Sequence, residues 1–104
     1  MKLVNAIMEH DLERVKELLD AGSDPNAEID ESRLRPMHFA AQENQIEIGE
    51  LLIKAGADIY ARTYPDEETP LEIATLHNNK EFVEMLLKHM RKAGRGSGDS
   101  GYIN

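Results

Sequence analysis

The chain repeats its own pattern every 34 residues. Positions one period apart share apolar character or small size, as in Leu3, Met37 and Leu71; Ala6, Ala40 and Ala74; and Leu18, Leu52 and Leu86. A period in this range is typical of a stacked array, in which each unit is one supersecondary element that cannot bury its apolar face alone. In such an array, function is expected on a surface rather than inside a cavity.

Within each copy, apolar residues recur at helical spacing between helix-start and helix-stop signals. The pattern predicts helices over residues 3–9, from Leu12 to a stop at Gly22, over 36–43 and 46–54, from Pro70 onward, and over 80–91. Turn-rich loops at 24–32 and 59–68 are expected to project from these helices. The predicted fold class is all-α, a helix-turn-helix solenoid of about three repeats with projecting loops.

The repeat pattern divides the chain into a repeat domain and a tail. The repeat domain is predicted over residues 1–93, with units at about 1–34, 35–68 and 69–93. Residues 94–104 have the Gly/Ser-rich composition of a flexible tail.

Local signals support the helix boundaries. Thr69, Pro70 and Glu72 stand as an N-cap hydroxyl, a proline at the first helical position and a glutamate two positions later, which together predict a capping box. Asn44 is placed to stop the helix before it. Gly49 costs up to about 1 kcal/mol relative to alanine inside a helix, so it is expected to make room for a bulkier neighbour.

Charge and composition exclude several function classes. The chain carries a net charge of −8, which disfavours binding to phosphate backbones and anionic membranes and favours a protein partner with a basic patch. No cysteine is present, which excludes a disulfide scaffold and a cysteine nucleophile and fits a cytoplasmic location, with the nucleus as an alternative. No signal peptide or membrane-spanning run is expected.

The motifs Thr69-Pro70-Leu71 and Gly56-Ala57-Asp58, with paired alanines and aliphatic helices between such ends, resemble the ankyrin repeat. The resemblance covers residues 3–90 and implies antiparallel helix pairs with projecting loops, without catalysis or a cofactor. It also implies that His38, at the histidine position of the family motif, makes a structural hydrogen bond to a neighbouring loop. Arg35, Tyr60 and Glu72 depart from the family pattern, which has threonine, asparagine and histidine there.

The residues show no catalytic or metal-binding arrangement. No nucleophile elbow and no phosphate-binding glycine loop is present, and His77 and Glu81 straddle a predicted turn instead of sharing one helix face. The chain is therefore predicted not to be an enzyme, and to hold neither metal nor cofactor.

The resemblance implies that a partner protein binds the concave side formed by loop tips and first helices. The candidate binding residues are those that periodicity does not assign to the core: Arg33, Leu34, Arg35, Gln42, Glu43, Tyr64, Asp66, Glu68, Leu76 and His77. Leu34, Tyr64 and Leu76 are expected to be exposed apolar side chains, and the chain alone is expected to be a monomer. Two alternatives stay open: an inhibitor or immunity-type subunit of an enzyme or toxin, and a scaffold fragment hydroxylated at Asn26.

Overall fold

The computed structural model describes residues 2–94 and contains six α-helices in this range. They are α1 (Lys2–Met8), α2 (Leu12–Asp20), α3 (Pro36–Gln42), α4 (Ile46–Lys54), α5 (Pro70–Leu76) and α6 (Lys80–Gly94). No strand occurs within the described residues. The predicted all-α class is therefore confirmed.

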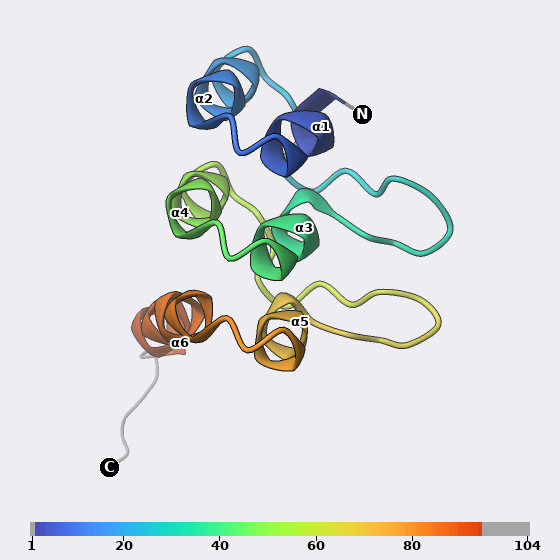
Figure 1. Cartoon of the computed structure of the whole chain (residues 1–104), viewed down its shortest axis with the longest axis vertical. Helices are drawn as coiled ribbons and strands as arrows, with labels where there is room; N and C mark the ends of the chain where they lie inside the picture. Colours follow the sequence, from blue (N-terminus) through green and yellow to red (C-terminus); the bar gives the residue numbers. More distant parts are fainter. Residues whose placement is uncertain (1, 95–104) are drawn as a thin grey trace.

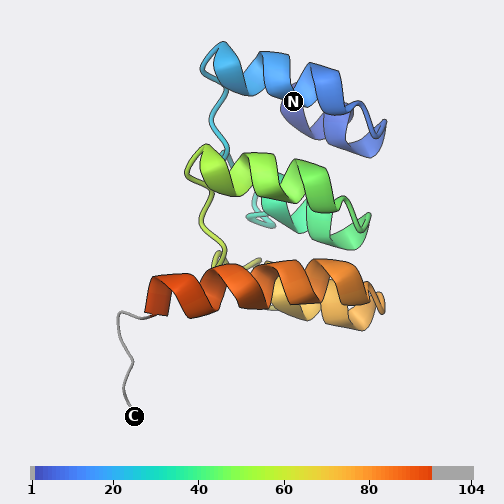
Figure 2. The ribbon, with the colours of Figure 1, turned by 90° about the vertical axis from the view of Figure 1, so that its left-hand side faces the viewer.

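The helices form three hairpins stacked in two layers. We call α1 with α2 the first unit, α3 with α4 the second, and α5 with α6 the third. Figure 1 shows α1, α3 and α5 in one layer and α2, α4 and α6 in the other, with two long loops extending beyond the first layer. Each layer is continuous, because α1 contacts α3, α3 contacts α5, α2 contacts α4 and α4 contacts α6. Figure 2 shows the second layer from outside.

The turn inside each hairpin has the same backbone conformation in all three units. His10, Asn44 and Asn78 lie one period apart and have φ angles of 59°, 55° and 59°. Asparagine adopts this left-handed conformation more readily than most residues, so the predicted stop at Asn44 is confirmed. Gly22 and Gly56 end α2 and α4 with φ angles of 99° and 100°, a region that glycine adopts without strain.

The first helices of the second and third units begin at proline but are capped differently. The Thr69 hydroxyl accepts a hydrogen bond from the Glu72 N–H at 3.2 Å, and the Thr69 N–H donates to the Glu72 carboxylate at 2.9 Å. The predicted capping box is therefore complete in α5. In α3 the guanidinium of Arg35 cannot accept a hydrogen bond, so only the reciprocal half exists, from the Arg35 N–H to Nδ1 of His38 at 2.9 Å.

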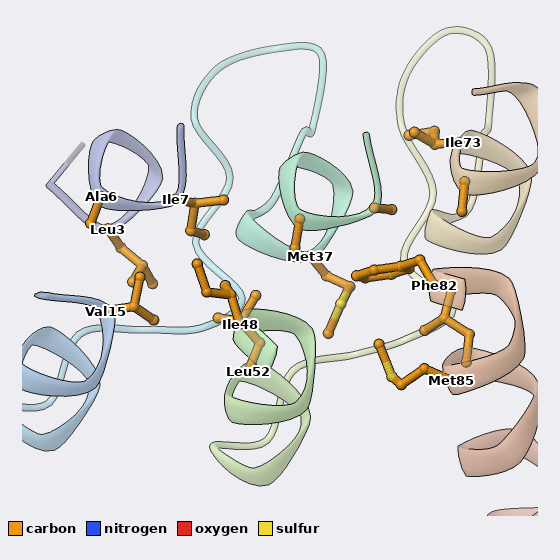
Figure 3. Close-up of a cluster of buried hydrophobic side chains, with 14 of the residues drawn as sticks. Leu3, Ala6, Ile7, Val15, Met37, Ile48, Leu52, Ile73, Phe82 and Met85 are labelled. Atoms are coloured by element: carbon orange, nitrogen blue, oxygen red, sulfur yellow. The ribbon is translucent and has the colours of Figure 1, made fainter. Parts of the chain in front are cut away.

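The core lies between the two layers and runs through all three units. Leu18, Leu52 and Leu86, which align in sequence, occupy equivalent buried positions with exposed fractions of 9%, 0% and 0%. Figure 3 shows Met37 and Phe82 meeting where the second unit packs against the third. Each unit therefore covers apolar surface that its neighbour would expose alone.

Gly49 provides the close approach of α4 to α6. A Cβ atom at this position would lie 2.7 Å from Cε of Met85 and 2.8 Å from Cε2 of Phe82. The sequence-based expectation that this glycine makes room for a bulkier neighbour is therefore confirmed, and Phe82 and Met85 are the neighbours.

Helix α6 corrects one predicted boundary. It continues to Gly94, three residues beyond the predicted end at 91, so Gly94 belongs to a helix rather than to the predicted tail. Lys88, Arg91 and Lys92 favour this extension because cations near a helix C-terminus interact well with its dipole. The rest of the predicted tail, residues 95–104, lies outside the described residues. The helices α1 and α3 each end one residue before the predicted position.

Candidate partner-binding face

The two projecting loops each close on themselves by the same backbone hydrogen bond. In the first loop the Ile29 N–H donates to the Leu34 carbonyl at 3.0 Å. In the second loop the Thr63 N–H donates to the Glu68 carbonyl at 3.0 Å, and these residues are one period further along the chain. Each of the two turn-rich loops predicted from the sequence is therefore closed by one backbone hydrogen bond at the same repeat position.

Local side chains shape the tips of these loops. Asp30 accepts hydrogen bonds from both the backbone N–H and the hydroxyl of Ser32, at 2.8 Å and 2.5 Å. The Ser32 hydroxyl, then its N–H, hold the pKa of Asp30 below its ordinary value because both bonds favour the carboxylate. In the second loop the Glu68 N–H donates to the Thr63 hydroxyl at 3.0 Å.

The two loops also contact each other directly. The Tyr64 N–H of the second loop donates to the Ser32 carbonyl of the first loop at 2.7 Å. The Arg33 guanidinium lies over the Tyr64 ring, 5.4 Å from its centroid, within the range of a cation–π interaction. These two contacts join the loops of neighbouring units beyond the first layer of helices, so the loop tips form one surface.

His38 connects the second loop to helix α3. Its side chain is buried, and its Nε2 lies 2.9 Å from the Ala61 carbonyl. Since Nδ1 accepts from the Arg35 N–H, Nε2 must carry the proton and donate to Ala61, which defines the neutral tautomer. Burial lowers the pKa of His38, although the Ala61 bond acts in the opposite direction. The structural hydrogen bond implied by the family resemblance is confirmed.

Two side chains tie the bases of the loops together. Asn26 donates to the Gly56 carbonyl at 3.0 Å and accepts from the Asp58 N–H at 2.7 Å. Arg35 reaches Glu28 at 3.4 Å and Asp58 at 4.0 Å. The guanidinium that replaces the family's capping threonine therefore bridges acidic groups of both loops.

The predicted binding residues do not all share one environment. Arg33, Gln42, Tyr64, Asp66, Leu76 and His77 are exposed, whereas Leu34, Arg35, Glu43 and Glu68 are partly buried. Tyr64 and Leu76 are 58% and 70% exposed, as expected for free apolar side chains. The prediction of an exposed Leu34 is wrong, because its side chain is partly buried where the first loop returns to α3.

The predicted residues do not form one continuous patch: Arg33, Tyr64 and Asp66 lie at the loop tips, and others lie near the hairpin turns or beside α5. We define the loop-tip face as Asp30, Glu31, Arg33, Tyr64, Asp66 and Glu67. Near the hairpin turns, Gln42 donates to Glu43 at 3.3 Å and Glu43 pairs with His10 at 3.3 Å. Glu68 and Leu76 line a shallow hollow beside α5. The loop-tip face is therefore the strongest candidate for a single binding surface.

Two residues beside the loop-tip face, Ser32 and Ile29, were not among the predicted binding residues. Ser32 supplies both the carbonyl that binds Tyr64 and the groups that orient Asp30, and its only sequence signal is the Asp-x-Ser spacing of a local turn. Ile29 is 38% exposed on the first loop. The position of Ile29 on this surface depends on its hydrogen bond to Leu34, which the sequence does not specify.

The described residues show neither a metal-type cluster nor a membrane-spanning helix. Among residues 2–94, no three histidine or carboxylate side chains are grouped so that they could hold a metal ion. In the same range, no helix combines the length and the apolar character that crossing a membrane requires.

Comparison with known proteins identifies the repeat. A family model described as ankyrin repeats, in three copies, matches residues 3–95. The match covers most of the chain and includes all three hairpins. A search of curated proteins returned no match.

Proposed function

Because the chain belongs to the ankyrin repeat family, whose repeats generally serve protein–protein interaction, we propose that it binds a partner protein through the loop-tip face and the adjoining surface of the first helices. The contact between the loops carries this proposal. With Tyr64 hydrogen-bonded to Ser32 and stacked under Arg33, the loop tips are ordered before a partner arrives. Preordered contact residues lower the entropy that binding must otherwise overcome.

The chemistry of the loop-tip face suits a basic partner. Asp30, Glu31, Asp66 and Glu67 are exposed in the same two loop tips as Arg33 and Tyr64, so the loop-tip face combines four carboxylates with an arginine–tyrosine pair. Tyrosine and arginine are the residue types that most often dominate binding energy when a partner covers them, and rim carboxylates act chiefly on the rate of encounter. A partner with lysine or arginine around an apolar pocket would match this surface.

Tyr60 provides a matched control for testing the face. Tyr60 and Tyr64 are 54% and 58% exposed, but Tyr60 lines a hollow beside α4 and α6 with Ile53 and His89, away from the loop tips. The immobilised full chain is used to capture partners, and the affinity of each captured protein is then measured for wild type, Tyr64→Ala and Tyr60→Ala. We expect Tyr64→Ala to weaken binding about tenfold or more and Tyr60→Ala to leave it unchanged.

The salt dependence gives a second criterion. If the carboxylates steer the partner, the association rate falls as salt is added while the dissociation rate changes little. Equal affinities for Tyr64→Ala and wild type, with the fold intact by circular dichroism, would remove the loop-tip face from the proposal.

Two narrower forms of the proposal need their own tests. An inhibitor or immunity-type subunit would reduce the activity of the captured protein when added back, whereas a scaffold would not. Hydroxylation of Asn26 would add the mass of one oxygen atom to the chain isolated from its cell. The side chain of Asn26 is already engaged with Gly56 and Asp58, so the modifying enzyme would have to open the loop base.

A further inference from the structure

The two ends of the stack differ in chemistry. Equivalent positions show which side chains a unit turns toward the next one. In the second unit, Met37 and Ala41 are 1% and 0% exposed, and the place of a Gly49 side chain is filled by Phe82 and Met85 of the third unit. The equivalents of these positions in the third unit are Leu71, Thr75 and Val83.

The N-terminal end of the stack is polar. At the positions where the third unit buries Ile73, Phe82 and Met85 against the second unit, the first unit has Asn5, Arg14 and Glu17. All three are exposed, and Arg14 pairs with Glu17 at 3.4 Å. This end is therefore unsuited to bury another apolar face.

The C-terminal end keeps its apolar side chains. We define the C-terminal end face by the outward residues of α5 and α6: Leu71, Thr75, Leu76, Val83 and Leu87. Leu76 and Leu87 are 70% and 39% exposed. Two shallow hollows meet at Thr75, one reaching Leu71 and Leu76 and the other reaching Val83. In Figures 1 and 2, α5 and α6 form the outermost unit at this end, and no described helix lies beyond them.

Charges on the two helices of this face are separated by sign. Glu68 and Glu72 edge the face on the side of α5, where they line the hollow beside Leu71. Lys80, Lys88 and Arg91 are exposed along α6, which also carries Glu84 beside Val83. An acidic edge and a mainly basic edge thus lie on opposite sides of one apolar strip.

We infer that the C-terminal end face binds the same face of a second copy of this chain and forms a two-fold symmetric dimer. A two-fold axis parallel to the helices places α5 of one copy on α6 of the other, so the acidic edge meets the basic edge twice. An axis perpendicular to the helices would instead place α5 on α5, with Glu68 and Glu72 near their own copies. Charge complementarity therefore selects the first arrangement.

The polar N-terminal end limits the assembly to two chains. A head-to-tail contact would place the apolar C-terminal end face on Asn5, Arg14 and Glu17 and would leave these polar groups without water. The face-to-face contact is self-complementary and closed, so it does not grow into a filament. The monomer expected from the sequence is then the species at low concentration, and the loop-tip face stays open in the dimer.

The oligomeric state of the full chain tests this inference. Sedimentation equilibrium over a wide concentration range should show a shift from 11.7 kDa toward twice that mass. Leu87→Glu should raise the dimer dissociation constant roughly 100-fold, because symmetry removes two leucines per dimer and each factor of ten corresponds to about 1.4 kcal/mol. Met8→Glu is the matched control, since Met8 is 42% exposed on the first unit, and it should leave the constant unchanged.

Cysteine cross-linking tests the arrangement of the two copies. The chain has no cysteine, so single cysteines can be introduced without background. Mixed Thr75→Cys and Val83→Cys chains should cross-link to each other faster than Val83→Cys chains cross-link among themselves. The reverse order would overturn the arrangement. A chain that stays monomeric at all concentrations, or a dimer indifferent to Leu87→Glu, would overturn the inference and assign the face to another occupant.

Discussion

Replacing Gly49 with alanine has two opposite effects on the free energy of unfolding. In an open helix, alanine in place of glycine stabilises by about 1 kcal/mol. Here the added Cβ would lie 2.7 Å from Cε of Met85 and 2.8 Å from Cε2 of Phe82. The end of the Met85 side chain can rotate away, but the Phe82 ring is 0% exposed within the core cluster, so it can move only by displacing its neighbours.

Overpacking of this kind typically costs about 1–3 kcal/mol, which exceeds the gain in helix propensity. We therefore expect Gly49→Ala to lower the free energy of unfolding by about 1 kcal/mol, which for a domain of this size corresponds to a fall in Tm of about 4–8 °C. Urea unfolding followed by circular dichroism at 222 nm measures the change.

A double-mutant cycle with Phe82→Leu isolates the contact. The smaller side chain should relieve the clash, so Gly49→Ala should be less destabilising, or stabilising, in the Phe82→Leu background, with a coupling energy of about 1 kcal/mol. Gly22→Ala is the control, since it has a φ of 99° and open space around it. Its cost should be the same in both backgrounds. A Gly49→Ala chain more stable than wild type would show that the contact with Phe82 and Met85 does not restrict this position.

Two further predictions concern single groups. His38 has a pKa below its ordinary value of 6.5, so on acidification the unfolded chain takes up a proton before the folded chain does. The contribution of neutral His38 to the free energy of unfolding is fully present above about pH 6.5. As the pH falls below this value, the contribution decreases by up to about 1.4 kcal/mol per pH unit, until the pH reaches the lower pKa of the folded state. His38→Gln, which keeps one donor and one acceptor, should remove this part of the acid sensitivity in unfolding titrations, whereas His77→Gln at an exposed site should retain it; equal pH profiles for wild type and His38→Gln would contradict the assignment. Thr69→Ala should lower the unfolding free energy by about 1 kcal/mol because it removes the acceptor for the Glu72 N–H, and Thr69→Ser, which keeps that acceptor, should restore most of it; an equal loss in both variants would argue against the cap.

The repeat could be predicted because its signals are local and occur in more than one copy. Ile46–Lys54 has the predicted bounds, since its start follows the turn at Asn44 and its end precedes the left-handed Gly56. The role of Gly49 could be predicted for the same reason, because the other two copies have valine at the equivalent positions, Val15 and Val83. Helix propensity and capping act within a few residues, so the sequence alone carries them.

The parts that could not be predicted depend on contacts between distant residues. Tyr64 bonds to Ser32 across the two loops, and nothing in either segment specifies that meeting. Leu34 is partly buried in the arm of the first loop that pairs with Ile29, and that pairing joins residues five apart. Gly94 suggested a linker by composition, although the helix before it continues through that position.

The difference between the two ends of the stack also required the structure. Aligned positions were visible in the sequence, but which of them face the preceding unit and which face the following unit depends on the stacking direction. The contacts of Phe82 and Met85 with Gly49 show that these repeat positions face the preceding unit. Arg14 and Glu17 hold the same positions in the first unit, so the N-terminal end of the stack is polar.

Backbone hydrogen exchange at Tyr64 reports directly on the joining of the two loops, and the binding surface exists as one unit only if they are joined. We expect the Tyr64 amide of the free chain, bonded to Ser32 at 2.7 Å, to exchange at least about tenfold more slowly than in an unstructured peptide, and Arg33→Ala to reduce this protection. Exchange of Tyr64 at the unstructured rate, with the helices still protected, would contradict this expectation.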